Sequence, residues 1–208
     1  MTRKHDPFIL ALESLRARAE DGVFAPGRPV VIAEEARRLR LSTTPVREAL
    51  AWLSGYGLIE RAPTGGYLAP RLDPAAVRDQ FAFRLHCLTI SVNGAAQDHR
   101  PERALNGSQI PDRPLAAQML RAVKGTGNAA LVDAYERVCS QLIQLAPAER
   151  RLFRDFDEEA ARIAGLFEAA QGSGLRDALA AYHQRRMDAA PLLILEADAR
   201  RDPPRPAG

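Results

Sequence analysis

Hydroxyl and guanidinium groups gather near the start of the stretch LSTTPVREALAWLSGYGLIERAPTGGYLAP, residues 41–70, in an order that suits phosphate binding. Thr43 and Thr44, together with the N–H groups of a helix's first turn, can receive a phosphate at the positive end of the helix dipole. Arg47 follows about one turn later, where its fork of donors reaches a phosphate or the O6 and N7 atoms of guanine. The chemistry that these residues support is recognition of a nucleic acid.

Catalytic and metal-binding motifs are missing from the sequence. It contains no GxSxG, HExxH or P-loop motif, no paired carboxylates and no Cys/His arrangement, so we predict that the protein is not an enzyme and needs no cofactor. Cys87 and Cys139 form no CxxC pair, and we expect free thiols rather than a disulfide. Three of the four histidines, His5, His86 and His99, show no metal-ligand spacing.

Two amphipathic helices are predicted before this stretch. Asp6 caps the first helix and Pro7 begins it, and the helix ends near Gly22. After APGRP breaks the chain, a second helix runs to about Leu39. The apolar faces comprise Phe8, Leu12, Leu15 and Ala19 in the first helix, and Ile32, Ala36 and Leu39 in the second.

The third helix is predicted to have Thr44 as its N-cap and Pro45 at its first position, where the missing N–H costs nothing. Arg47 then lies on the outward face, opposite the apolar stripe. Trp52, the single tryptophan, is expected to pack in the core or at an interface rather than to contact a base. The stripe comprises Val46, Ala49, Leu50 and Leu53.

A hairpin is predicted directly after the third helix, with strands at Leu58–Arg61 and Tyr67–Ala69. Gly65 and Gly66 form its turn and let the backbone come close to a partner. Three helices followed by a hairpin is the order of a winged helix, which inserts its third helix into the major groove of DNA. A helical module for dimerisation or protein binding would have the same order, and it remains the alternative.

From Asp73 onward the apolar spacing is helical throughout. We predict a mostly α fold with an N-terminal winged helix-turn-helix domain over residues 1–72 and an all-α helical-bundle domain over residues 73–200. Residues 98–114 are predicted to form a long loop and residues 201–208 a disordered tail. Pro191 is predicted to kink or end the last helix.

Charge is unevenly distributed along the 208 residues. Residues 1–72 hold 11 Lys and Arg against 8 Asp and Glu, whereas residues 73–208 hold 18 of each, so the net charge of +3 belongs to the first segment. No apolar run approaches the roughly 18 to 20 residues of a membrane span, and MTRKHDPFIL lacks the apolar core of a signal peptide. We therefore expect a cytoplasmic protein with no membrane contact.

The segment PGRPVVIAEEARRLRLSTTPVREALAWLSGYGLIERAPTGGYLAP resembles the DNA-binding domain of the GntR family of bacterial transcription regulators. The part of this segment that is most specific to the family is the heptad TPVREAL, with GL and an aliphatic residue further along the chain. The resemblance implies double-stranded DNA as the partner. It places Ser42, Thr44, Arg47 and Gly66 at DNA-contacting positions and Arg61 at a backbone contact at the base of the wing.

This sequence departs from the family pattern at three positions. Thr43 stands where SRTP has arginine, and Gly65 stands where the wing often has arginine, although both are still expected at the DNA surface. Losing two cationic contacts is expected to lower affinity and to flatten the salt slope by roughly 1 to 2. Glu35 occupies a position that is usually apolar, which a one-residue shift of the second helix would explain.

The remaining helices resemble the all-helical effector domain of the fatty-acid and vanillate-type regulators within this family. By that resemblance Arg84, Asn128 and His183 are candidate effector-binding residues. Many such domains hold a metal through one Asp and three His, but three of those positions fall here on Leu115, Met119 and Arg162. One imidazole cannot hold a transition metal, so we predict no metal site. The corresponding pocket is then either more apolar, which suits an apolar or weakly acidic effector, or filled by side chains.

The leading hypothesis is a homodimeric, sequence-specific transcriptional regulator, more consistent with a repressor than an activator, on a palindromic operator. A small-molecule effector in the helical domain would control it. The alternative is an interaction or adaptor protein whose winged helix has lost effective DNA reading and whose helical domain only dimerises.

Overall fold

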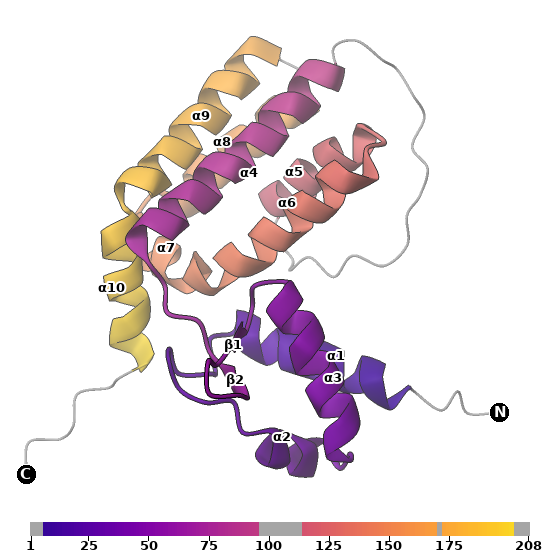
Figure 1. The fold of residues 1–208 in the computed structure, drawn as a ribbon. Coiled ribbons are helices and arrows are strands. Elements are labelled where there is room, and N and C mark those ends of the chain that lie inside the picture. Colours follow the sequence, from indigo (N-terminus) through magenta and orange to yellow (C-terminus); the bar gives the residue numbers. More distant parts are fainter. Residues whose placement is uncertain (1–5, 96–113, 170–171, 202–208) are drawn as a thin grey trace, which may run out of the picture. The chain divides into compact units, whose positions relative to one another are not determined.

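The computed structural model describes residues 6–95, 114–169 and 172–201, and the chain divides into two compact units, Met1–Leu72 and Asp73–Gly208 (Figure 1). We call them the N-terminal unit and the C-terminal unit. The predicted loop and tail lie outside the described residues, apart from Pro114, which begins a helix, and Arg201, which ends one. His5 and His99 also lie outside them. No helix within the described ranges is long and apolar enough to cross a membrane.

The N-terminal unit has the predicted order of helices followed by a hairpin. The carboxylate of Asp6 accepts a hydrogen bond from the Phe8 N–H at 2.9 Å, so the first helix begins where the Asp-Pro signal predicts. Its elements are α1 (Pro7–Glu20), α2 (Ile32–Leu39), α3 (Thr43–Gly55), β1 (Glu60–Arg61) and β2 (Tyr67–Leu68). The core comprises Ala11, Leu15, Val30, Ala36, Val46, Ala49, Leu50, Leu53, Leu58, Ile59 and Tyr67.

The structure corrects the predicted start of α3. The N-cap is Ser42 rather than Thr44, and Thr43 is the first helical residue. Serine and threonine both favour the N-cap position, so the local sequence does not choose between these neighbours. Pro45 is tolerated within the first turn because the first N–H groups of a helix have no partner inside it.

The turn between α2 and α3 contains a residue whose backbone is in the left-handed helical conformation. Arg40, with φ 56° and ψ 39°, ends α2, and the Leu41 N–H donates to the Ala36 carbonyl at 2.9 Å. This hydrogen-bond pattern closes many helices, but the left-handed conformation costs an L-residue about 1 kcal/mol relative to glycine. Arg40 is the only non-glycine residue with positive φ among the described residues.

Glu35 needs no shift of α2 to explain its presence. The helix points it toward the core, where its side chain is 8% exposed and pairs with Arg18 of α1 at 3.2 Å and with Arg38 at 2.9 Å. Two guanidinium partners let a carboxylate occupy this buried position.

Of the two environments predicted for Trp52, the core or an interface, the core was wrong. Its side chain is 40% exposed and stacks on Tyr56, with ring centroids 4.6 Å apart. The interface alternative remains a prediction.

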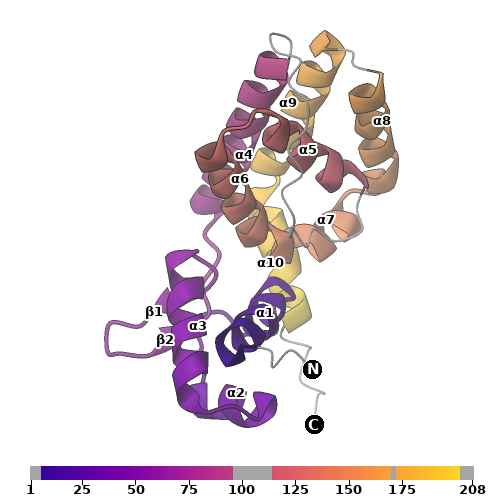
Figure 2. The same cartoon turned by 90° about the vertical axis from the view of Figure 1, so that its right-hand side faces the viewer.

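The C-terminal unit is entirely helical within its described residues. Helix α4 runs beside α9 in both views and also contacts α5 and α6 (Figures 1 and 2). Its elements are α4 (Pro74–Ala95), α5 (Pro114–Gly125), α6 (Ala129–Leu142), the 3-10 turn η1 (Ile143–Leu145), α7 (Ala146–Leu152), α8 (Phe156–Glu168), α9 (Gly172–Asp188) and α10 (Ala190–Arg201).

A proline separates the last two helices. Helix α9 ends at Asp188, and Pro191 is the second residue of α10, as the prediction of a kink or an end at this proline requires. The predicted fold class, a mostly α chain with a winged helix-turn-helix followed by a helical domain, is confirmed.

Candidate functional site

The N-terminal tip of α3 is exposed and has no side-chain cap. Ser42, Thr43 and Thr44 are all exposed, and the Ser42 side chain makes no capping hydrogen bond. The first N–H groups of a helix have no acceptor inside it. Because Pro45 has no N–H, the helical residues of α3 that offer such a free donor are Thr43 and Thr44. Two backbone donors and three hydroxyls therefore meet at the positive end of the helix, an arrangement that binds phosphate.

Arg47 lies on the outward face of α3, next to the buried residue Val46. Its backbone is held by the hairpin, because Tyr67 is buried and its hydroxyl lies 3.5 Å from the Arg47 carbonyl oxygen. Arg61 is exposed in β1 and pairs in register with Tyr67. The hairpin thus holds the backbone of α3 at Arg47 and leaves the Arg47 side chain free to extend outward.

The wing tip is built from two glycines with positive φ. Gly65 has φ 94° and Gly66 has φ 84°, and both are exposed. No atom lies within 4 Å of the position that a Cβ would take at either residue, so backbone conformation rather than crowding requires glycine. Figure 2 shows the loop that joins β1 and β2 projecting away from α3, which leaves the backbone of the tip open to a partner.

Two groups of arginines in the N-terminal unit differ in their partners. Arg16, Arg18 and Arg38 make ion pairs with glutamates of the same unit. No ion pair within the described part of the chain involves the second group, which comprises Arg37, Arg40, Arg47 and Arg61. The second group lies on α2, the turn after it, α3 and β1, and it carries unneutralised positive charge.

A second polar cluster lies in the C-terminal unit, where α4 meets α9. The Arg84 Nε donates to the His183 Nε2 at 3.1 Å, and the His183 Nδ1 lies 2.7 Å from the Leu179 carbonyl oxygen. A guanidinium can only donate and a carbonyl can only accept, so these two partners fix a neutral imidazole with its proton on Nδ1. His183 is fully buried, and burial, followed by the charge of Arg84, lowers its pKa well below the ordinary value.

Arg84 itself has no carboxylate partner among the described residues. Its Nη2 is enclosed and makes no hydrogen bond, and the guanidinium carbon lies 5.0 Å from the centre of the Phe81 ring and 5.8 Å from that of Tyr182. On α6, burial raises the pKa of both Tyr135 and Cys139, which keeps these neighbours of Arg84 uncharged. Arg84 is therefore a cation with an enclosed donor and no anion beside it.

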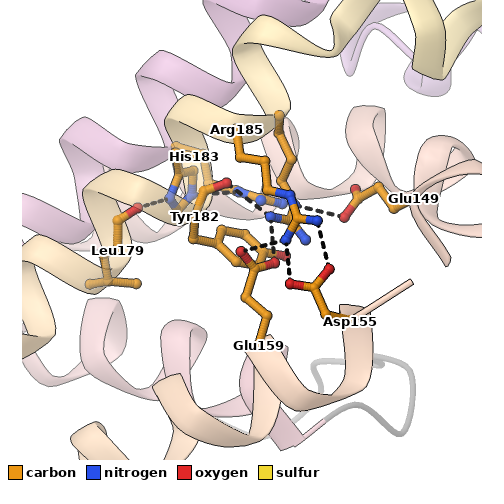
Figure 3. A network of polar contacts seen from close by, with 9 residues as sticks. Glu149, Asp155, Glu159, Leu179, Tyr182, His183 and Arg185 are labelled. Atoms are coloured by element: carbon orange, nitrogen blue, oxygen red, sulfur yellow. Dashed lines mark hydrogen bonds and ion pairs between the residues drawn. The ribbon is translucent and has the colours of Figure 1, made fainter. Parts of the chain in front are cut away.

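Arg186, one turn beyond Tyr182 on α9, differs from Arg84 in having carboxylate partners, although its Nη2 is likewise enclosed without a hydrogen bond. It is fully buried and binds Glu149 of α7 at 2.8 Å and Glu159 of α8 at 2.9 Å, and it also donates to the Tyr182 carbonyl oxygen. Arg185 reaches Glu159 and Asp155 from the exposed side, as the close view of this network shows (Figure 3). The network joins three helices and satisfies the charge of Arg186.

The residues at the implied metal positions do not fit a metal ion. Leu115 and Met119 are buried among apolar side chains, Arg162 is exposed, and both ring nitrogens of His183 already have protein partners. No group of three or more potential ligands was found among the described residues.

Asn128 is exposed, and its Oδ1 accepts from the Leu131 N–H at 3.1 Å. The structure thus brings together Arg84 and His183 of the three candidate effector residues and gives Asn128 a role as the N-cap of α6.

Sequence reasoning missed Arg186 and the acids that hold it. The signal was available, because Arg186 follows the apolar residues Leu175, Leu179 and Tyr182 at the next helical step. An arginine on a buried stripe requires acidic partners, although the sequence does not show which acids supply them.

No protein-family model matches the sequence. An uncharacterized HTH-type transcriptional regulator of Agrobacterium vitis, from the TAR-I ttuE-ttuC′ intergenic region, is 30% identical over 127 residues. The match covers 61% of this chain and 66% of that relative. In this chain the third helix carries the TPVREAL heptad.

The chain is similar to a helix-turn-helix transcriptional regulator, and its TPVREAL heptad resembles the GntR family of such regulators. McbR/YncC of E. coli has a similar fold, with a TM-score of 0.53 and 18% identity over 90% of this chain and 98% of that one. Lar, which controls expression of the agr system of Listeria monocytogenes, aligns over 92% of this chain and 96% of its own, with 13% identity and a TM-score of 0.47. A GntR family member from Pseudomonas syringae aligns over 94% and 89%, with 17% identity and a TM-score of 0.41.

Proposed function

We propose that this protein is a sequence-specific DNA-binding regulator that reads its operator with α3 and the wing. The observation that carries the proposal is the uncapped tip of α3 with the unpaired Arg47 one turn behind it. Phosphates on the Thr43 and Thr44 N–H groups would fix the register of α3 on the duplex, and Arg47 would then reach base edges. Gly65 and Gly66 would bring the wing backbone to the neighbouring sugar-phosphate edge, with Arg61 at its base. No step of this function is catalytic.

The proposed assembly is a homodimer on a palindromic operator, acting as a repressor. One recognition helix covers only a few base pairs, and a two-fold axis doubles the contacts without further sequence. The all-helical C-terminal unit would hold the two copies together, as the resemblance to the fatty-acid and vanillate-type regulators implies.

We also propose that a small weakly acidic effector binds at Arg84. A buried guanidinium without a counter-ion is unfavourable, and a carboxylate at the enclosed Nη2 would supply both the missing charge and the missing hydrogen bond. His183 would orient Arg84 through the bond to Nε.

Arg47→Ala tests the DNA-reading function. Fluorescence anisotropy on duplex DNA from upstream of the protein's own gene, over a salt series, is expected to show tight and steeply salt-dependent binding by the wild type. The variant is expected to bind roughly tenfold more weakly and with less sequence preference. Arg121→Ala removes an equally exposed charge from α5 and should bind like the wild type. A wild type that does not distinguish this DNA from random duplex would favour the adaptor alternative, which the uncharged Thr43 and Gly65 motivate.

Arg84→Met tests the effector site. Butyrate and benzoate are expected to raise the thermal unfolding midpoint of the wild type, since a ligand that binds only the folded state stabilises it. The variant should not respond, and its own midpoint without ligand should be somewhat lower, because the buried His183 Nε2 loses its donor. An equal response of both proteins to the carboxylates would contradict the assignment of Arg84.

A further inference from the structure

We propose that Arg40 is a DNA-backbone contact that supplies, from the turn before α3, the positive charge that Thr43 does not supply from within it. The proposal rests on the DNA-reading function proposed above. It adds a residue to the interface that neither the family resemblance nor the geometry of the α3 tip includes.

The first observation is the backbone conformation of Arg40. Its φ of 56° lies in the region that favours glycine, and the hydrogen bond from the Leu41 N–H to Ala36 fixes it there. Any side chain at this position is therefore held against a backbone preference. Within the N-terminal unit a glycine would close α2 equally well.

The second observation is that no contact of the Arg40 side chain with a described residue offsets the free-energy cost of the left-handed conformation. Arg40 is exposed, and its guanidinium makes no ion pair, hydrogen bond or aromatic contact with a described residue. Arg38, two residues earlier, shows the contrast, because it binds both Glu35 and Ser14. Folding thus accounts for Arg38 and leaves Arg40 unexplained.

The third observation is the place of Arg40 in the chain. It precedes Ser42 by two residues and Thr43 by three, so its Cα lies at most about 11 Å from that of Thr43. A guanidinium on a long stem reaches across this distance to a phosphate that the N–H groups of Thr43 and Thr44 bind. Because the hydrogen bond from the Leu41 N–H holds the backbone of the turn, the Arg40 side chain extends from a defined point close to the tip of α3.

Arg40→Gly gives opposite expectations for folding and for binding. The thermal unfolding midpoint should rise by about 2 to 5 °C, because glycine relieves the left-handed strain. At a salt concentration of about 0.15 M the dissociation constant for duplex DNA should increase about fivefold, and the slope of log K against log salt should fall by about 0.9 for each bound protomer. A gain in stability together with a loss of affinity excludes misfolding as the cause of weaker binding.

Two further variants complete the test. Arg40→Lys keeps the charge and is expected to keep the wild-type salt slope. The double variant Arg40→Gly with Thr43→Arg is expected to recover the slope, because an arginine returns to the tip of α3. If it does not recover, Arg40 does not substitute for a charge at Thr43.

The outcomes separate the two proposals. If the wild type binds DNA with a steep salt slope and Arg40→Gly has the same slope, the Arg40 contact is overturned while the regulator function stands. If the wild type itself shows no salt-dependent binding, the regulator function fails and the Arg40 contact fails with it.

Discussion

Replacing Arg186 with methionine is expected to lower the free energy of unfolding of the C-terminal unit by about 3 to 5 kcal/mol. Arg186 is fully buried, and the side chains of its partners Glu149 and Glu159 are 6% and 7% exposed. Methionine fills much of the volume but leaves the buried Glu149 without a cation and the buried Glu159 with only the partly exposed Arg185. The large effect arises from those unpaired charges rather than from a lost attraction, since a buried ion pair as a whole is close to neutral for stability. Urea unfolding followed by far-ultraviolet circular dichroism measures the change.

The neighbouring arginine provides the matched control for Arg186. Arg185→Met removes the same chemical group from the same helix, but Arg185 is partly exposed and its partner Asp155 is in contact with water. A much smaller loss is expected. Replacing Glu149 and Glu159 with leucine in the Arg186→Met background should restore most of the stability. Equal losses for Arg185→Met and Arg186→Met would contradict the role given to burial.

Lowering the pH from about 7.5 to about 5 is expected to destabilise the C-terminal unit through His183. An unfolded histidine has a pKa near 6.5. Burial, with the charges of Arg84 from α4 and Arg186 from α9, holds the folded pKa well below that value. Below about pH 6.5 the unfolded chain therefore takes up a proton that the folded chain does not, and stability falls by up to about 1.4 kcal/mol per pH unit. Above that pH this residue contributes no pH dependence.

His183→Gln isolates this contribution, because an amide can both donate and accept but does not titrate. Urea unfolding of both proteins at the two pH values should show a steeper loss in the wild type. Asp155 does not interfere, since its hydrogen bond with Arg185 lowers its pKa and keeps the carboxylate ionised over this range. Parallel pH profiles of wild type and variant would show that His183 is protonated in the folded protein or exposed to solvent.

The features that the sequence predicted correctly depend on neighbouring residues. Asp6-Pro7 caps α1, Gly65-Gly66 turns the wing and Pro191 separates two helices through local backbone preferences. The start of α3 was misplaced for a related reason, because three consecutive residues can each cap a helix.

What the sequence could not predict depends on contacts between distant segments. Glu35 and Arg186 are polar residues on buried stripes, and each has a partner on another helix. The pairing of Arg84 with His183 joins residues 99 positions apart. Arg40 illustrates a third case, in which an ordinary exposed side chain stands on a backbone conformation that the sequence does not reveal.

The exposed stack of Trp52 on Tyr56 has a practical consequence. Because the chain has a single tryptophan and it lies on α3, intrinsic emission excited near 295 nm reports on the N-terminal unit alone. Circular dichroism reports mainly on the C-terminal unit, which holds most of the helices. One titration with denaturant therefore follows each unit by its own signal. Coincident curves would indicate that the two units unfold as one cooperative body, and separated curves would give each unit its own stability.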